Sequence, residues 1–153
     1  MRVCRATTAP AALSGGISGL KVLKTTDSEF ADFVTDRYRT LKDTHDRIMA
    51  TSVNAHWAYN TQKADFNACY AAACGALLAA FAAHHSLAVQ QTLLAMGQAV
   101  IEACPAIDSI KLELPNLHRI PFDLQPFGLK NENDIFVPVD EPHGFITGEV
   151  KRR

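Results

Sequence analysis

The segment RIMATSVNAHWAY, residues 47–59, carries larger apolar side chains at every second position. Successive side chains of a β-strand point to opposite faces of its sheet, so this pattern predicts one long strand with a strongly apolar face. The opposite face is small and mildly polar instead of charged, which indicates that it meets another sheet or lines a barrel in an oligomer. The expected core face comprises Met49, Thr51, Val53, Ala55, Trp57 and Tyr59.

Two helices are expected after this strand. The segment from Asp65 to about Ala83 is rich in alanine, and its larger apolar residues recur on one side of a helix. Ser86 is a candidate N-cap for a second helix, because a serine there can accept a hydrogen bond from a free backbone N–H group. The expected buried stripes are Phe66, Tyr70, Ala73, Leu77 and Phe81 in the first helix, and Val89, Leu93, Met96 and Val100 in the second.

Further strands are expected on both sides of these helices. Leu20–Lys24 and Ile110–Pro115 alternate in polarity, and Val137 together with Phe145–Val150 indicates a last strand or hairpin. The order is thus strand, strand, two helices, strand, strand. This order predicts an α+β fold in which an antiparallel four-stranded sheet carries two long helices on one face.

A short helix is also expected near Ser28. Thr26 and Glu29 have the spacing of a capping box, in which two side chains satisfy each other's backbone N–H groups. Apolar residues follow at helical spacing, namely Phe30, Phe33, Val34 and Tyr38.

The composition indicates one domain without a strongly charged surface. With 153 residues, 48% of them apolar, the chain can bury one core, and its formal net charge of -1 indicates neither a nucleic-acid nor an anionic-lipid partner. No uninterrupted apolar run reaches the length of a membrane-spanning helix. We expect residues 17–153 to form the domain. Residues 1–16 are expected to be a linker or the remnant of a preceding domain, with a transit peptide as the alternative.

The cysteines and the last residues bear on localisation and on metal binding. Cys4, Cys69, Cys74 and Cys104 lack the density of a disulfide-stabilised secreted domain, so reduced thiols in a cytoplasmic protein are expected. The C-terminal residues are not a peroxisomal signal of the Ser-Lys-Leu type, although a peroxisomal location stays open. Cys69 and Cys74 would point about 140° apart on a helix, so no metal site is expected.

The glycine-rich segment Gly15–Lys21 does not fit a phosphate-binding loop. It lacks the GxxxxGK[ST] spacing and precedes a strand, so a flexible linker is the better interpretation. The chain contains neither a GxSxG nor an HExxH motif, which removes support for hydrolases of those kinds.

Three segments carry side chains suited to binding or catalysis. Arg47 presents a planar fork of donors that suits a carbonyl oxygen beside a ring nitrogen, although a surface ion pair with Asp46 is the plainer alternative. Gln90 falls in the first turn of the second expected helix, where free N–H groups favour anions, unless it is simply solvated. Asn116 and His118 follow a strand end, where loops often carry chemistry, although a loop histidine is usually just exposed.

Five segments together resemble the C-terminal half of urate oxidases, in the same order and at compatible spacings. They are SGLKVLKTTDSEF (18–30), DRIMATSV (46–53), VQQTLLAMG (89–97), LPNLH (114–118) and FVPVDEPHGFI (136–146), and the likeness extends from about Ile17 to Val150. The resemblance implies the tunnelling fold (T-fold), in which four subunits, each of two related domains, form a barrel around a central tunnel. It places the active sites at subunit interfaces.

The resemblance also implies which residues would hold the substrate. Phe30 would stack on the purine ring. Arg47 and Gln90 would hold opposite edges of urate, and the backbone N–H of Val89 would bind an oxygen.

Two further residues would take part in the chemistry that the resemblance implies. Asn116 would help to hold dioxygen or water above the ring, and His118 would belong to a proton relay. A lysine and a threonine of the family's N-terminal domain complete this relay, and the likeness here begins about midway through the family pattern. The implied reaction converts urate, dioxygen and water to 5-hydroxyisourate and hydrogen peroxide, with no cofactor and no metal.

Three functions stay open at this point. The first is a urate oxidase subunit that forms a homo-oligomer or associates with a urate oxidase N-terminal domain. The second is a catalytically incomplete fragment that acts as a purine-binding or assembly module. The third is a tunnelling-fold enzyme acting on pterins, which would need an acidic anchor in place of Gln90. Neither a nucleic acid nor a membrane is expected as a partner.

Overall fold

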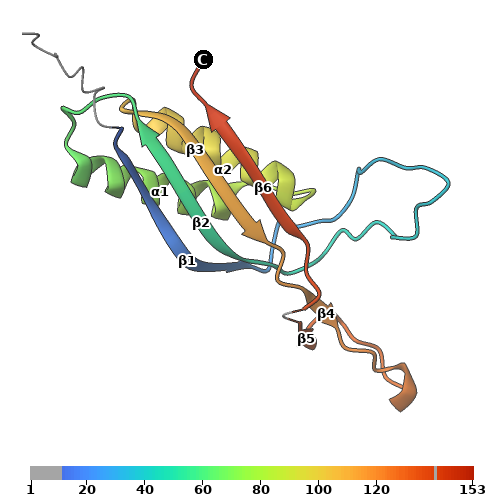
Figure 1. Ribbon diagram of the computed structural model, residues 1–153. Helices are drawn as coiled ribbons and strands as arrows, with labels where there is room; N and C mark the ends of the chain where they lie inside the picture. Colours follow the sequence, from blue (N-terminus) through green and yellow to red (C-terminus); the bar gives the residue numbers. More distant parts are fainter. Residues whose placement is uncertain (1–11, 140) are drawn as a thin grey trace, which may run out of the picture.

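An antiparallel sheet organises the computed structural model of the protein, which describes residues 12–139 and 141–153. The sheet has four strands in the order β1-β2-β3-β6. Their bounds are Ser14–Lys24 (β1), Met49–Tyr59 (β2), Ile107–Pro115 (β3) and Phe145–Lys151 (β6). Two helices, α1 (Phe66–Ala83) and α2 (Val89–Ala103), cover one face of this sheet, as Figure 1 shows. The predicted α+β architecture is therefore confirmed.

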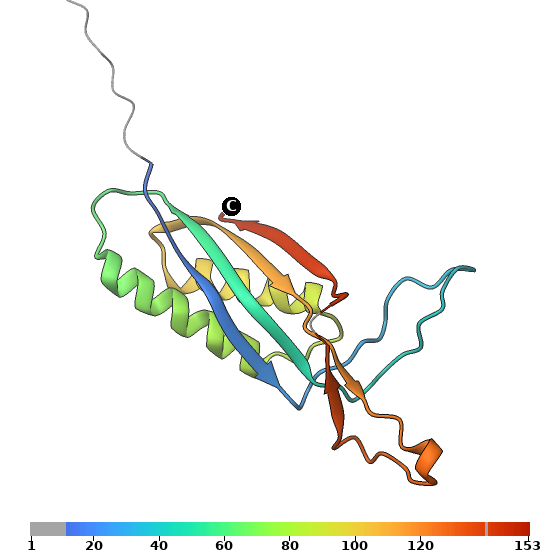
Figure 2. The ribbon, with the colours of Figure 1, turned by 60° about the horizontal axis from the view of Figure 1, so that its bottom comes forward.

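A second, smaller sheet projects from one end of the main sheet (Figure 2). It consists of β4 (Arg119–Pro121) and β5 (Phe136–Pro138), which pair in antiparallel fashion. The 3-10 helix η1 (Gln125–Phe127) lies in the loop between them. The segment with β4, η1 and β5 connects the end of β3 to the start of β6.

The strand β2 follows the predicted alternation. Every second residue from Met49 to Trp57 is buried, and Val53 and Trp57 have no exposed surface. Tyr59, the last residue expected on this face, is half-buried. This row and the inner sides of the helices supply most of the core. Burial of such apolar surface is the dominant favourable contribution to folding.

The two helices bury most of the residues that the sequence predicts. Asp65 caps α1, since its carboxylate accepts a hydrogen bond of 3.0 Å from the backbone N–H of Ala68. Tyr70 and Phe66 are the exceptions among the expected helix residues, because Tyr70 is 48% exposed with its ring bordering that of Trp57, and Phe66 is only half-buried. The buried residues of the two stripes are Ala73, Leu77 and Phe81 in α1, and Val89, Leu93, Met96 and Val100 in α2.

The helix α2 approaches β6 closely at Gly97. A Cβ atom at this position would lie 2.5 Å from Cγ2 of Val150, far inside van der Waals contact. Glycine inside a helix costs about 0.5–1 kcal/mol relative to alanine. The close approach of helix and strand explains why glycine stands here.

The helix α1 is apolar enough to cross a membrane by length and composition, with 18 residues of mean hydropathy 1.6. Asn67 and Gly75 interrupt its apolar sequence, so it does not form an uninterrupted apolar run. Its buried residues pack into the same core as the sheet. A helix that covers a sheet and contributes to its core can have the same composition.

The glycine-rich segment at the start of β1 is a strand, so its interpretation as a flexible linker is wrong. Pairing with β2 begins at Ser14, opposite Ala58, and continues to Lys24. The register shifts between Ile17 and Leu20, where Gly19 has a φ of 69° and its N–H donates to the side chain of Asn54. Pairing along a neighbouring strand overrides the weak strand preference of glycine, and the bulge explains the glycine at residue 19.

The short helix expected near Ser28 is absent, because residues 25–48 contain neither a helix nor an extended strand. Asp27 and Asp32 have φ values of 51° and 56°, which a right-handed helix does not allow. Isolated bridges hold this segment instead, since Ser28 pairs with Ser86, and Phe30 pairs with Thr44. These distant partners override the local helical spacing.

The predicted N-cap of α2 is also wrong. Ala88 occupies the N-cap position and no side chain caps the helix. Ser86 is fully buried, and its hydroxyl donates to the carbonyl of Ala88 and accepts from the hydroxyl of Thr92 at 2.8 Å. Its hydroxyl is therefore used inside the α1–α2 connection.

Candidate functional site

The segments with the predicted site residues meet at one end of the main sheet. At this end β1 finishes, β2 starts, β3 finishes and β6 starts, and α2 begins nearby (Figure 1). The backbone N–H of Glu29 donates to the carbonyl of Ser86 at 2.7 Å, and that of Ala31 donates to Leu87 at 3.2 Å. The backbone N–H of Leu117 donates to Ala50 at 3.0 Å. These bonds tie the stretch after β1 to the start of α2, and the end of β3 to the start of β2.

Arg47 and Phe30 form the best-defined part of this region. The Nε of Arg47 donates to the backbone carbonyl of Glu29 at 2.7 Å, and its guanidinium carbon lies 5.7 Å from the centre of the Phe30 ring. Its Nη2 is buried and has no hydrogen-bond partner among the described residues. Burial lowers the pKa of Arg47 from its ordinary value, because a charge is costly away from water. A buried donor without a partner leaves room for an acceptor supplied by a ligand.

The ion pair of Arg47 with Asp46, the plainer alternative, is not formed in the described part of the chain. The carboxylate of Asp46 instead accepts from the side-chain amide of Asn133 at 2.7 Å.

Aromatic and cationic groups continue outward from Phe30. The ring of Phe33 stacks on that of Phe30, with 4.5 Å between centroids and an angle of 22° between planes. The guanidinium of Arg39 lies over Phe33 at 4.5 Å, and Arg39 pairs with Asp43 at 2.7 Å. One face of Phe30 is therefore covered from within the chain.

Val89 and Gln90 open the helix α2, as the sequence predicts for Gln90. Val89 is buried and Gln90 is exposed. The first N–H groups of an α-helix have no partner within the helix, and no side chain caps them here. The helix dipole adds partial positive charge at the same place, so this helix start suits an electronegative oxygen.

Asn116 and His118 lie just after β3 and are both half-buried. The backbone N–H of Asn116 donates to Gly144 at 2.8 Å, and the carbonyl of His118 accepts from Val139 at 3.0 Å. Backbone bonds therefore fix both residues, while neither side chain has a hydrogen-bond partner in the described ranges. Their side chains are available to other groups.

The structure thus gathers the six predicted residues into three groups, and in the described ranges no hydrogen bond or ring contact joins side chains of different groups. The Arg47 guanidinium lies over the Phe30 ring, Val89 and Gln90 follow the connection that pairs with residues 28–31, and Asn116 and His118 follow the strand that pairs with β2. Sequence reasoning missed one prominent member of this region, Glu29, whose carboxylate contacts two histidines from separate segments. Only its position beside Phe30 could have drawn attention to it.

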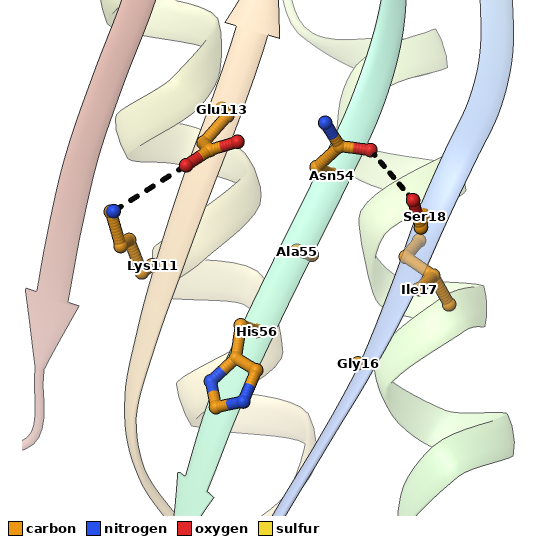
Figure 3. Close-up of a pocket in the computed structure, with 8 residues that line it drawn as sticks. All are labelled: Gly16, Ile17, Ser18, Asn54, Ala55, His56, Lys111 and Glu113. Atoms are coloured by element: carbon orange, nitrogen blue, oxygen red, sulfur yellow. Dashed lines mark hydrogen bonds and ion pairs between the residues drawn. The ribbon is translucent and has the colours of Figure 1, made fainter.

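A groove of about 440 Å³ lies elsewhere, on the sheet face away from the helices (Figure 3). Its polar contacts include Ser18 with Asn54 at 3.2 Å and Lys111 with Glu113 at 3.4 Å. None of the six predicted residues lines this groove.

The cysteines lie apart from this region. Cys69, Cys74 and Cys104 are free thiols, and Cys4 lies outside the described residues. A hydrogen bond with Cys104, together with burial, raises the pKa of Cys69 to about 11. Among the described residues no group of three or more His, Cys, Asp or Glu side chains is placed to hold a metal ion.

Comparison with known proteins identifies the family. The family model described as Uricase matches residues 13–147. The chain is 54% identical to the uricase of Arthrobacter globiformis over 141 residues, covering 92% of this chain and 47% of that protein. It is 39% identical to the uricase of Dictyostelium discoideum, covering 90% of this chain and 48% of that protein.

Solved structures agree with this match. The crystal structure of uricase from Arthrobacter globiformis superposes with a TM-score of 0.88. The match covers 92% of this chain and 49% of the crystal structure's chain. The urate oxidase of Bacillus sp. TB-90, at 20% identity, has a TM-score of 0.75 and shows the same fold. The tunnelling fold expected from the sequence is thus confirmed. The chain spans about half the length of the relatives that it matches, and it belongs to the uricase family.

Proposed function

We propose that this chain forms part of a urate oxidase, which oxidises urate with dioxygen and water to 5-hydroxyisourate and hydrogen peroxide without a cofactor. In this proposal the chain supplies the substrate-holding wall and part of the proton relay. The partner is a domain equivalent to the other half of the related uricases. The observation that carries the proposal is the buried, unpaired Nη2 of Arg47 beside the ring of Phe30, in a chain of the uricase family.

The arrangement of Phe30 and Arg47 suits a flat anion. Phe33 covers one face of the Phe30 ring, so a planar substrate would stack on the other face. The bond from Nε to the carbonyl of Glu29 fixes the guanidinium plane and leaves Nη2 to donate to the edge of the substrate. The negative charge of urate would also offset the cost of burying the Arg47 charge.

The start of α2 would hold the opposite edge of the substrate. The backbone N–H of Val89 would donate to a urate oxygen, and the Gln90 side chain can both donate and accept there. Helix N-termini bind anions in this way because their N–H groups and dipole act together.

Asn116 and His118 would serve the oxygen chemistry. Their half-buried side chains have no hydrogen-bond partner in the part of the chain that is described, and backbone bonds fix their positions. Asn116 would hold dioxygen or water above the purine, and His118 would pass protons between the substrate and the solvent. General acid–base catalysis of this kind typically contributes 10²- to 10⁴-fold to the rate.

A partner domain is required for two reasons. The predicted residues lie in three groups whose side chains make no hydrogen bond or ring contact with one another in the described ranges. The lysine and threonine that the family resemblance adds to the relay belong to the other half. The strands β1 and β6 are both edges of the main sheet, and such edges are commonly paired in an assembly. Four chains in a barrel, or this chain with a separate N-terminal half, would pair them.

The test follows urate absorbance and peroxide formation in three mixtures. They contain the chain alone, the chain with the N-terminal half of the Arthrobacter globiformis uricase, and the same pair carrying His118→Ala. We expect no oxidation in the first mixture, oxidation in the second, and a turnover in the third that is reduced more than the urate affinity. If the folded pair shows no oxidation, the proposed activity is wrong.

The same experiment separates the second candidate, a purine-binding or assembly module without catalysis. This second candidate is tested because the chain covers only about half the length of each relative. Such a module would bind urate in the paired state, with Arg47 required for affinity, and would produce no peroxide.

A further inference from the structure

The carboxylate of Glu29 joins two histidines that are far apart in the sequence. Its Oε2 lies 2.6 Å from Nδ1 of His45, and its Oε1 lies 2.8 Å from Nε2 of His85. The other nitrogen of His85 is 3.6 Å from the carboxylate of Asp27. The Glu29 side chain is only 17% exposed, whereas His45 and His85 are 72% and 55% exposed. Both histidines therefore cover the carboxylate from the solvent side.

The backbone of Glu29 makes two more connections to the same segments. Its N–H donates to the carbonyl of Ser86 at 2.7 Å, and its carbonyl accepts from Nε of Arg47 at 2.7 Å. One residue thus makes four hydrogen bonds, two to the segment of His45 and Arg47, and two to the α1–α2 connection. It also directly precedes Phe30.

We propose that Glu29 is a positioning residue for urate, resting on the proposed function above. Its carboxylate, through His45 and His85, ties the segment that carries Arg47 to the α1–α2 connection. This tie keeps the backbone carbonyl of Glu29, which accepts from Arg47, and the neighbouring Phe30 in a fixed arrangement with the start of α2. Glu29 itself does not touch the substrate.

The segment around Glu29 has few other interactions that would fix its position. Residues 25–48 form no helix and no extended strand, and most of residues 32–46 are exposed. A segment of this kind has little burial to fix it, so its order depends on a few polar contacts. Hydrogen bonds to an ionised group are about twice as strong as neutral ones, and a carboxylate can accept at both oxygens.

The ionisation state of Glu29 is consistent with this role. The hydrogen bond from His45 and then that from His85 hold the pKa of Glu29 below its ordinary value. The group is therefore a carboxylate at neutral pH. It accepts hydrogen bonds from both imidazoles.

The catalytic test uses substitutions in the chain paired with the uricase N-terminal half. Glu29→Ala should raise the urate KM by about tenfold or more, with a smaller effect on kcat, because substrate placement is lost while the relay remains. Glu29→Gln should recover part of this loss, because an amide keeps one acceptor oxygen. Glu132→Gln is the matched control, since Glu132 is 70% exposed and pairs with Lys130 in the β4–β5 loop. An unchanged KM in folded Glu29→Ala protein would overturn the proposal.

A second measurement needs no activity and keeps the proposal testable if the paired enzyme is inactive. Nuclear magnetic resonance on the full chain can follow solvent exchange of the Nε proton of Arg47, which bonds to the Glu29 carbonyl. Exchange should become at least several-fold faster in Glu29→Ala and in His45→Ala, and stay unchanged in Glu132→Gln. Unaltered exchange in both Glu29→Ala and His45→Ala would reject the positioning role, whatever the assay for urate shows. Failure of urate oxidation in the wild-type pair would instead reject the proposed function.

Discussion

The body of the sheet and the segment between β1 and β2 are held by different forces. In the body, Val53, Trp57 and Val100 have no exposed surface. In the segment, Val34 is 90% exposed and Tyr38 is 71% exposed. Yet the exposed segment carries Phe30 and Arg47, the residues expected to grip the substrate. Burial maintains the fold, whereas a small number of polar and ring contacts maintain the site, so substitutions in the two regions should separate stability from binding.

The largest effect is expected from Trp57→Ala in the body of the sheet. Trp57 is fully buried between sheet and helices, and truncating a buried aromatic typically costs about 3–5 kcal/mol. Denaturant unfolding of the chain should show this loss. The matched change in the exposed segment, Tyr38→Ala, should alter stability by less than about 0.5 kcal/mol. Equal losses for the two variants would remove the distinction between the regions.

The next effect is on urate binding instead of stability, and it is expected at Arg47 in the exposed segment. Arg47→Lys should weaken urate binding by about 1.5–3 kcal/mol, since a lysine ammonium cannot reproduce a planar two-donor fork. Lys21→Ala, a change of an exposed cation on β1, should leave affinity nearly unchanged. Anaerobic titration of urate into the paired enzyme measures both. Matching affinities for the two variants would exclude Arg47 from the site.

The sequence predicts these two regions unequally well. In β2, α1 and α2 the regular spacing of apolar residues reflects burial on one face, and the structure buries most of these apolar residues. The helix at Ser28 and the linker at Gly15 are wrong because distant chain segments decide both, whereas the cap at Ser86 is wrong because its hydroxyl bonds to nearby Ala88 and Thr92. Ser28 bridges Ser86, and the glycine-rich stretch pairs with β2.

Residue types alone predict even less of the candidate site. Arg47 and Gln90 attracted attention by their donors and helix position, but Phe30 and Val89 came only from the family resemblance. Glu29 was assigned to a capping box, since nothing in a linear pattern places His45 and His85 on the same carboxylate.

A smaller effect is expected from Phe33→Leu. This change removes the ring that stacks on Phe30, and such pairs contribute about 0.5–1.5 kcal/mol beyond burial. The urate KM should rise by about two- to tenfold while the melting temperature hardly changes. Val34→Ala, one position further along the exposed segment, is the control. A large fall in melting temperature with an unchanged KM would mean that Phe33 supports the fold and not the site.

The smallest effect is a pH dependence of stability at Glu29. The pKa of Glu29 is lowered in the folded state, so its contribution is present above the unfolded pKa of about 4.3 and is lost as the pH falls through the folded pKa. Wild type should therefore melt above Glu29→Gln at neutral pH, and the two curves should converge as the pH falls through the lowered folded pKa. A difference in melting temperature that persists at low pH would show that the carboxylate charge is not involved.

The central claim is that this chain holds the substrate but needs a second domain to oxidise it. The most direct test titrates the uricase N-terminal half into a fixed amount of the chain and records urate loss and peroxide at each ratio. The account predicts no oxidation before the addition, then a rise that reaches a plateau at about one N-terminal half for each chain. Robust oxidation by the chain alone, or oxidation that follows the added half regardless of the chain, would contradict it.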